Sequence, residues 1–327
     1  MGKGRLTKAQ RNRLEGYRKL NRQKGFFDPK LRPLSGKERK IALSKARICG
    51  FPLGSNLKAL SCLDVFFRKR IPFKQNKSLQ KWSPNELEKQ GYETLPKNRA
   101  CIVLEKTSYN VFCIYVPCTA DPCVEHELRF FKMAFLIASK VKPKLAKRGF
   151  DFEGSMYMFG HRFDTYSNAF KEYAYNADTL DEEMGVLASH FSGMQSLERR
   201  HIPALSDERA HLVENVNAPT LVGENVVATT GSITKGYGCL PHKDKLSLLV
   251  ESIAFHNPPR RRLKWMFALP CAKVMVDLGG APGMLYVPAK EYHATLPCGE
   301  DHIGLGSAIF TKSLLVGRRA RCEFSNK

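Results

Sequence analysis

The sequence predicts an α+β fold with a jelly-roll core of short strands, bracing helices and a basic helical N-terminal segment. Residues 225–310 predict the core, because short apolar runs alternate there with turns rich in Gly and Pro, as in sandwiches and jelly-rolls. Residues 124–147 and 181–197 predict the bracing helices, because their apolar side chains recur at helical spacing.

The N-terminal segment is dominated by positive charge. Residues 1–50 contain sixteen Lys or Arg side chains against three acidic ones. Residues 6–23 have the composition of a basic helix, and a second helix is expected at 35–47 with a serine at its N-cap. We expect residues 1–48 to form a basic segment that lies on phosphates or serves as a nuclear address, with a solvated tail as the alternative. Residues 49–327 are expected to form a single domain.

Five further elements are expected before the core. They are a short helix at 60–67, a β-hairpin at 100–106 and 110–116 that extends the core sheet, a long helix at 124–147, a strand or loop at 150–159, and a helix at 181–197.

Two stretches in this part allow a functional and a structural interpretation. Residues 66–74 interleave aromatic and cationic side chains, which suits nucleic-acid binding, although core aromatics flanked by surface charge are the simpler interpretation. Cys113, Cys118 and Cys123, with His126 just beyond, raise the alternative of a zinc site. They lack the Cys-x2-Cys spacing of recognisable zinc sites, so ordinary buried thiols are the expectation.

The composition limits the class of protein. A net charge of +22 favours a polyanionic partner, DNA or RNA, without choosing between them. No apolar run reaches the length that spans a bilayer, and the N-terminus lacks the apolar core of a signal peptide. We therefore expect a soluble intracellular protein without a membrane partner, whose ten cysteines are reduced.

The core itself is expected to contain six short strands, with Gly236, Tyr237 and Gly238 ending the first of them. The expected strands are 225–233, 246–250, 265–269, 273–278, 284–287 and 303–310.

A charged motif follows the first of these strands. Residues 241–245 read Pro-His-Lys-Asp-Lys, and residues two apart on a strand point to the same face. His242 and Asp244 would therefore aim an imidazole and a carboxylate at one point, and His293 from a neighbouring strand would complete two histidines and a carboxylate. This set is the signature of non-haem Fe(II) oxygenases. The alternative is an exposed polar pair flanked by lysines, with an ordinary half-buried histidine.

The order of these features resembles the double-stranded β-helix (jelly-roll) core of Fe(II)/2-oxoglutarate dioxygenases, over about residues 220–315. The Pro-His-Lys-Asp-Lys motif is most similar to the TET/JBP branch, which oxidises methylated bases in DNA. The resemblance implies that His242, Asp244 and His293 bind iron and carry catalysis. It also implies that the substrate is the 5-methyl group of 5-methylcytosine in DNA, flipped out of the duplex, and that the protein acts in the nucleus.

One position departs from the family pattern. The family has an arginine ten to fifteen residues after the second histidine, where its guanidinium grips the distal carboxylate of 2-oxoglutarate. This chain has His302 there and no arginine, followed by Gly304, Gly306 and Lys312 on the same face. His302 or Lys312 could supply the cation, and the small residues could leave room for a cosubstrate or could simply pack tightly. Ascorbate, which a related algal enzyme that modifies 5-methylcytosine uses, is the alternative cosubstrate.

Two other functions remain open at this stage. The first is a non-catalytic, basic nucleic-acid-binding protein with a degenerate jelly-roll, which the charge and the missing arginine favour. The second is an oxygenase of the same fold that acts on RNA or on a protein.

Overall fold

A computed structural model gives the fold of the chain. It describes residues 31–53, 63–73, 82–140, 152–164, 169–173, 181–215, 217–244, 247–256, 265–279, 281–296 and 304–312. Among these residues, no helix is both long and apolar enough to cross a membrane.

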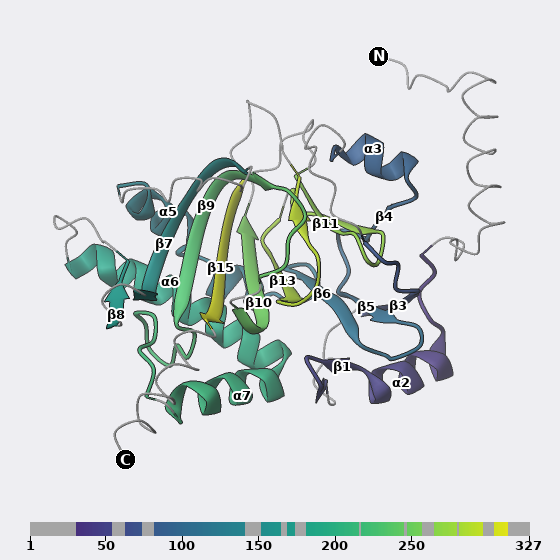
Figure 1. Cartoon of the computed structure of the whole chain (residues 1–327), viewed down its shortest axis with the longest axis horizontal. Coiled ribbons are helices and arrows are strands. Elements are labelled where there is room, and N and C mark those ends of the chain that lie inside the picture. The colour runs from purple at the N-terminus through teal and green to yellow at the C-terminus, as the bar shows by residue number, and fades with distance from the viewer. Residues whose placement is uncertain are drawn as a thin grey trace.

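The largest element is a nine-stranded sheet, which is antiparallel except for the pair at one edge. Figure 1 shows its strands fanning across the molecule. In spatial order they are β3 (Asp64–Arg68), β5 (Cys101–Glu105), β6 (Val111–Pro117), β13 (Gly283–Pro288), β10 (Ser247–His256), β15 (Leu305–Lys312), β9 (Thr230–Cys239), β7 (Phe152–Asp164) and β8 (Ala169–Glu172).

A second sheet of four short strands packs on one face of the first. Its order is β14 (Ala294–Thr295), β11 (Met266–Leu269), β12 (Val274–Asp277) and β4 (Glu93–Thr94). One apolar cluster joins the two sheets, with Phe112, Phe255 and Leu285 from the large sheet against Phe267 and Val276 from the small one. The two sheets therefore form a sandwich, and the face between them is where a jelly-roll places its site.

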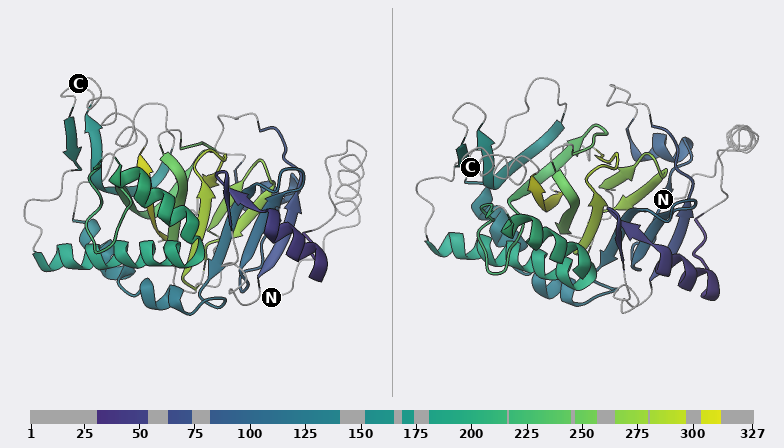
Figure 2. Two further views of the ribbon diagram at one scale, coloured as in Figure 1. Left: turned by 90° about the horizontal axis from the view of Figure 1, so that it is seen from below. Right: turned by 60° about the horizontal axis from the view of Figure 1, so that its bottom comes forward.

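Helices cover the opposite face of the large sheet, as Figure 2 shows for α6 and α7. The helices on this face are α2 (Gly36–Lys45), α4 (Cys123–Glu127), α5 (Phe131–Ala138), α6 (Asp181–His201) and α7 (Pro203–Glu214). Helix α3 (Pro84–Lys89) packs against the small sheet instead. A small hairpin pairs β1 (Arg47–Ile48) with β2 (Phe51–Pro52). The main core lies between this face and the helices, where Phe131, Leu187 and Met194 pack against Ala254 and Tyr286. The fold is thus mixed α/β, with layers of helix, large sheet and small sheet.

Several expected elements are confirmed. The hairpin is β5 and β6, which join the nine-stranded sheet. The described part of the stretch expected at 150–159, residues 152–159, belongs to strand β7. The helix expected at 181–197 is α6, with Leu187, Phe191 and Met194 buried, and the one expected at 35–47 is α2. The basic helix expected at 6–23 lies outside the described residues. The division into 1–48 and 49–327 stays a prediction.

Three expectations were wrong in their local structure. Residues 64–68 form strand β3 rather than a helix, because they extend the sheet in parallel beside β5. The long helix expected at 124–147 is broken into α4 and α5 by Leu128–Phe130. Gly236 does not end a strand but lies inside β9 with a φ of 56°, next to the register shift where β7 pairs with β9.

Candidate metal centre

Two histidines from distant parts of the sequence are held side by side by their backbones. His242 and His293 form an isolated antiparallel bridge. The amide of each donates to the carbonyl of the other, at 2.9 and 3.0 Å. The two imidazole rings consequently lie 4.5 Å apart between centroids. The segment after β9 and the residue just before β14 thus bring together two residues fifty-one positions apart in the chain.

The carboxylate of the motif faces both rings. Asp244 is anchored by its amide, which donates to the carbonyl of Ala289 at 3.0 Å. Its Oδ2 lies 3.1 Å from Nε2 of His293, and its Oδ1 lies 3.7 Å from Nε2 of His242. One potential ligand atom from each of the three residues lies within 4.8 Å of the others. Among the described residues, this is the one group of three or more such side chains that could hold a metal ion.

The second nitrogen of each ring is engaged by a backbone carbonyl. Nδ1 of His242 lies 2.8 Å from the carbonyl oxygen of Leu240, and Nδ1 of His293 lies 3.1 Å from that of Glu291. A carbonyl only accepts, so each Nδ1 must carry the proton and donate it. Nε2 of each ring is thereby turned toward Asp244, and in a neutral ring with this tautomer it is the nitrogen that would bind a metal ion. Such carbonyl partners are the usual orienting contacts of metal-binding histidines.

An aromatic ring and several ionisable groups surround the three residues. The ring of His293 is stacked on Phe267, with centroids 5.4 Å apart and planes inclined by 13°. Burial raises the pKa of Asp244, but its hydrogen bond to His293 and the charges of both histidines bring it well below its usual value. Burial lowers the pKa of His242, but the neighbouring Cys239 and Asp244 raise it to about 10.

A second carboxylate, which the sequence patterns did not single out, lies beside this group. Glu251 on β10 is buried, and its Oε2 lies 3.8 Å from Nε2 of His293. Burial raises the pKa of Glu251 well above its usual value, and the adjoining Asp244 carboxylate raises it further. A sequence signal was present, since Glu251 is an isolated charge within the apolar run of β10. Charges in such positions are rarely buried without a partner.

The inner face of β15 is filled rather than open near its beginning. A Cβ on Gly304 or on Gly306 would lie 2.9 or 3.1 Å from the indole of Trp265. The glycines therefore make room for this ring, whose Nε1 donates to the carbonyl of Tyr237 at 3.1 Å. The tight-packing interpretation of these glycines is the one that the structure supports.

The two cations expected to bind a cosubstrate are placed differently. Lys312 lies at the far end of β15, opposite Ser247 of β10. Its ammonium donates to the hydroxyl of Tyr173 and lies 5.0 Å from the centre of that ring. His302 lies outside the described residues. A role for either in binding a cosubstrate stays a prediction.

The other motifs of the sequence are structural where the structure describes them. Cys113 is buried in β6, while His126 is exposed on α4, so no zinc cluster forms there among the described residues. In the stretch 66–74, Phe66 is buried and Arg70 is ion-paired to two glutamates, as expected of core aromatics flanked by charge.

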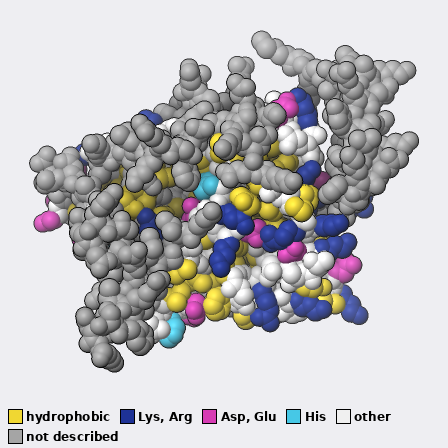
Figure 3. All heavy atoms as spheres, viewed as in Figure 1, with side chains coloured by type: hydrophobic (Ala, Val, Ile, Leu, Met, Phe, Trp, Pro, Cys, Tyr) yellow, Lys and Arg dark blue, Asp and Glu magenta, His cyan; other side chains and the backbone are white. Residues whose placement is uncertain are grey.

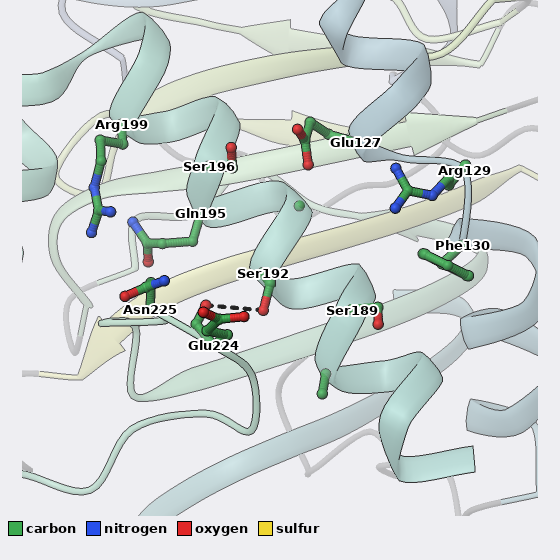
Figure 4. Close-up of a pocket in the computed structure, with 12 residues that line it drawn as sticks. Glu127, Arg129, Phe130, Ser189, Ser192, Gln195, Ser196, Arg199, Glu224 and Asn225 are labelled. Carbon is green, nitrogen blue, oxygen red and sulfur yellow. Dashed lines mark hydrogen bonds between the residues drawn. The ribbon is translucent and has the colours of Figure 1, made fainter. Parts of the chain in front are cut away.

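A polar cavity of about 460 Å³ opens on the helical side of the molecule. Figure 4 shows that it lies along α6, where Ser192 donates a hydrogen bond to the carbonyl of Glu224 at 3.0 Å. Arg129 and Arg199 flank it. Helix α6 packs on the face of the large sheet opposite to the small sheet, so this cavity is separate from the histidine and carboxylate cluster.

Comparisons with known proteins find likeness in structure alone. No family model and no curated protein matches the chain. Several solved structures are similar to it in fold.

NgTET1 in complex with 5mC DNA has 13% sequence identity and a TM-score of 0.48, over 86% of this chain and 93% of that one. OsALKBH1 has 11% identity and a TM-score of 0.33, over 61% and 96% of the two chains. A prolyl-4-hydroxylase from Pseudomonas putida has 8% identity and a TM-score of 0.31, over 58% and 86%. The chain is therefore similar in fold to these proteins, as the resemblance predicted from the sequence implies.

Proposed function

We propose that the protein is an Fe(II)-dependent dioxygenase with a double-stranded β-helix core, which oxidises or otherwise modifies the 5-methyl group of 5-methylcytosine in DNA. The observation that carries the proposal is the fixed orientation of the two histidines. Both rings donate through Nδ1 to backbone carbonyls and present Nε2 to Asp244. Side chains that merely filled a core would have no need of this arrangement.

The donor set fits ferrous iron. Two imidazole nitrogens and one carboxylate on one side of an ion leave the other side open, which is the facial arrangement of non-haem Fe(II) oxygenases. His242, Asp244 and His293 would hold the ion, with Leu240 and Glu291 fixing the two rings. Iron bound there would supply dioxygen activation, with two electrons drawn from the methyl C–H bond and two from a reducing cosubstrate.

An aromatic ring of the protein orients one proposed ligand side chain and excludes water from it. Phe267 stacks on His293, and Trp265 occupies the space beside Gly304 and Gly306. The stacked Phe267 ring covers one face of His293, keeps water from it and restrains its rotation. A base must leave the duplex to reach such a site, as it does in other enzymes that modify bases.

The charge supports a nucleic-acid substrate. Figure 3 shows Lys and Arg side chains gathered on the half of one face that carries α2 and the β3–β5–β6 edge. Exposed cations there include Lys37, Lys40, Lys45, Arg47 and Lys106. Together with the net charge of +22, such a surface attracts the phosphate backbone through counterion release. DNA as the polyanion and the nucleus as the location come from the resemblance stated above.

The cosubstrate is proposed to be 2-oxoglutarate, with ascorbate as the alternative. 2-Oxoglutarate is the cosubstrate that the resemblance implies, with His302 or Lys312 as the cation for its distal carboxylate. On the described part of β15, no arginine is present to take that role. The residues that the structure describes therefore give no fit for the distal carboxylate, and we derive no step through 2-oxoglutarate.

The test is anaerobic loading with iron, followed by aerobic incubation with methylated duplex DNA. Parallel reactions contain 2-oxoglutarate, ascorbate, both or neither, and mass spectrometry of the nucleosides reads the product. A modified cytosine that is absent with His242→Ala is expected. If iron binds but no cytosine changes, the substrate is wrong and RNA or protein should be tried next. If no iron binds, a non-catalytic nucleic-acid-binding protein is the better account.

A further inference from the structure

Lys243 and Tyr292 are the chain neighbours of the two histidines, and they contact each other. The ammonium of Lys243 lies over the ring of Tyr292, 4.5 Å from its centre. His242 and His293 form the backbone bridge, and successive side chains of an extended chain point to opposite sides. Lys243 and Tyr292 therefore lie on the side of this short ribbon that is opposite to the two imidazoles.

The ring of Tyr292 is held in place by other aromatic rings. Phe73 meets it edge to face, with the ring centroids 5.2 Å apart. Trp82 meets Phe73 in the same way, with the centroids 5.7 Å apart, and Trp82 is buried. A cation is attracted to the face of a tyrosine ring. Because the ring is fixed, this attraction restrains the direction of the Lys243 side chain.

The charge of Lys243 is not neutralised within the part of the chain that the structure describes. Lys243 is exposed, and no carboxylate among the described residues forms an ion pair with it. The two carboxylates of the ribbon have other partners. Glu291 accepts from the guanidinium of Arg70 at 2.9 and 2.7 Å, and Asp244 faces the two histidines. The ammonium is therefore available to an anion from outside the protein.

The metal centre is most exposed along the segment that contains Lys243. The side chains of Asp244 and His242 are 31% and 16% exposed, whereas that of His293 is 5% exposed. A substrate therefore approaches the centre from the side of residues 242–244. When a base is flipped into a site of this kind, the sugar–phosphate backbone of its strand stays outside. Lys243 lies where that backbone would pass.

We propose that Lys243, held on the face of Tyr292, binds a backbone phosphate of the substrate strand next to the base that enters the metal centre. The proposal rests on the function proposed above and adds a residue that positions its substrate. An ammonium binds phosphate as a point charge, and each neutralised phosphate releases condensed counterions. A side chain that is restrained beforehand loses less entropy on binding. Since phosphates carry no sequence information, Lys243 positions the strand and does not select the base.

The experiment measures binding by the full-length, Mn(II)-loaded protein under anaerobic conditions. A fluorescent duplex with one 5-methylcytosine is titrated at several salt concentrations. The variants are Lys243→Gln, Lys243→Arg and the control Lys132→Gln, which alters an exposed lysine of α5 on the helical side. Lys243→Gln is expected to reduce the slope of log affinity against log salt by about one. Lys243→Arg should restore the slope, and the control should not change it.

Two further measurements separate a positioning role from a general effect of charge. Tyr292→Leu keeps the charge of Lys243 but removes the ring, so affinity should fall by about two- to fivefold at an unchanged salt slope. Duplexes with one uncharged methylphosphonate near the 5-methylcytosine then locate the phosphate. At the contacted position the wild type should lose affinity, whereas Lys243→Gln should lose none, because the charge pair is already absent. Calorimetry should show wild-type Mn(II) affinity in every variant, since none alters a proposed ligand.

Two results would overturn the proposal while leaving the proposed function intact. One is a Lys243→Gln protein with the affinity and salt slope of the wild type. The other is a set of methylphosphonate effects that are the same in Lys243→Gln as in the wild type at every position. If the wild type does not bind the duplex at any salt concentration, both DNA as the substrate and this inference are wrong.

Discussion

Arg70 offers a sharp test of how the metal centre is held in shape. Its guanidinium donates to both carboxylate oxygens of Glu291, at 2.9 and 2.7 Å, and to Glu105 at 3.1 Å. The carbonyl of Glu291 in turn fixes Nδ1 of His293. Arg70 is thus two contacts away from a proposed ligand. Arg70→Lys keeps the charge but cannot reproduce the fork.

The expected magnitude follows from the geometry. Hydrogen bonds to charged groups contribute about 1.5–3 kcal/mol, but the side chain of Arg70 is 37% exposed, and solvent screening reduces its contribution. We expect a loss of about 1–2 kcal/mol in the free energy of unfolding. Displacing a residue that orients a ligand costs about 10–100-fold in metal affinity, and we expect the lower end, about tenfold, because the backbone bridge of His293 remains.

The assay combines urea unfolding with Mn(II) calorimetry on Arg70→Lys and a matched control, Arg99→Lys. Arg99 bonds to Asp64 at 2.9 Å and is similarly exposed, but none of its contacts leads to the cluster. The control should lose some stability and keep its affinity for Mn(II). Wild-type affinity in Arg70→Lys, alongside the expected loss of stability, would refute the link from Arg70 to His293.

Three further outcomes are expected. Gly306→Ala should destabilise the protein by about 1–3 kcal/mol through overpacking, because the added carbon would lie 2.7 Å from Oγ1 of Thr234 and 3.1 Å from Trp265; an unchanged urea midpoint would contradict this. Arg209→Met should cost about 3–5 kcal/mol by leaving Glu198 buried and unpaired, and the double variant with Glu198→Met should cost less; a double variant that costs more would refute the reasoning. Burial lowers the pKa of His190 to about 3, so below pH 6.5 the unfolded state takes up a proton that the native state refuses. Stability should fall by about 1.4 kcal/mol per pH unit toward pH 3 from this group, and His190→Leu should show a correspondingly flatter dependence in urea unfolding.

The sequence predicted the parts of the site that depend on local spacing. His242 and Asp244 are two residues apart, so strand alternation predicted that their side chains face one point, although both residues lie in the connection between β9 and β10 rather than on a strand. The structure also brings His293 beside them, because the backbones of His242 and His293 form an antiparallel bridge. The sequence had placed His293 on a strand next to the motif. The position of Glu251 beside the cluster was not predicted. The pairing of β10 with β15 shifts between Leu248 and Ser252, where Leu249 has a φ of 61°. The direction of the Glu251 side chain depends on this bulge, and the order of apolar and polar residues does not reveal a bulge.

Tertiary packing decided the elements that were predicted incorrectly. The segment around Phe66 has an apolar run compatible with helix or strand, and the free edge of β5 selected the strand. The break between α4 and α5 falls at Leu128, which is buried in the main core. Apolar periodicity continues through this break, so the pattern alone could not reveal it. The small size of Gly304 and Gly306 was visible in the sequence, but the ring that fills the space beside them belongs to Trp265, the residue just before β11.

The buried ion pair on the helical side bears directly on the metal centre. The bulge in β10 removes regular pairing with β15 at Val250, and Arg209 donates to that carbonyl at 2.9 Å. The same guanidinium donates to Thr311 of β15 at 2.9 Å and is held by Glu198. Arg209 therefore replaces the lost ladder contacts from one face of the sheet, while Glu251 projects from the other face beside His293. Since a buried pair is rarely worth its desolvation in stability alone, its role here is to hold the strand in the irregular shape that the proposed site requires.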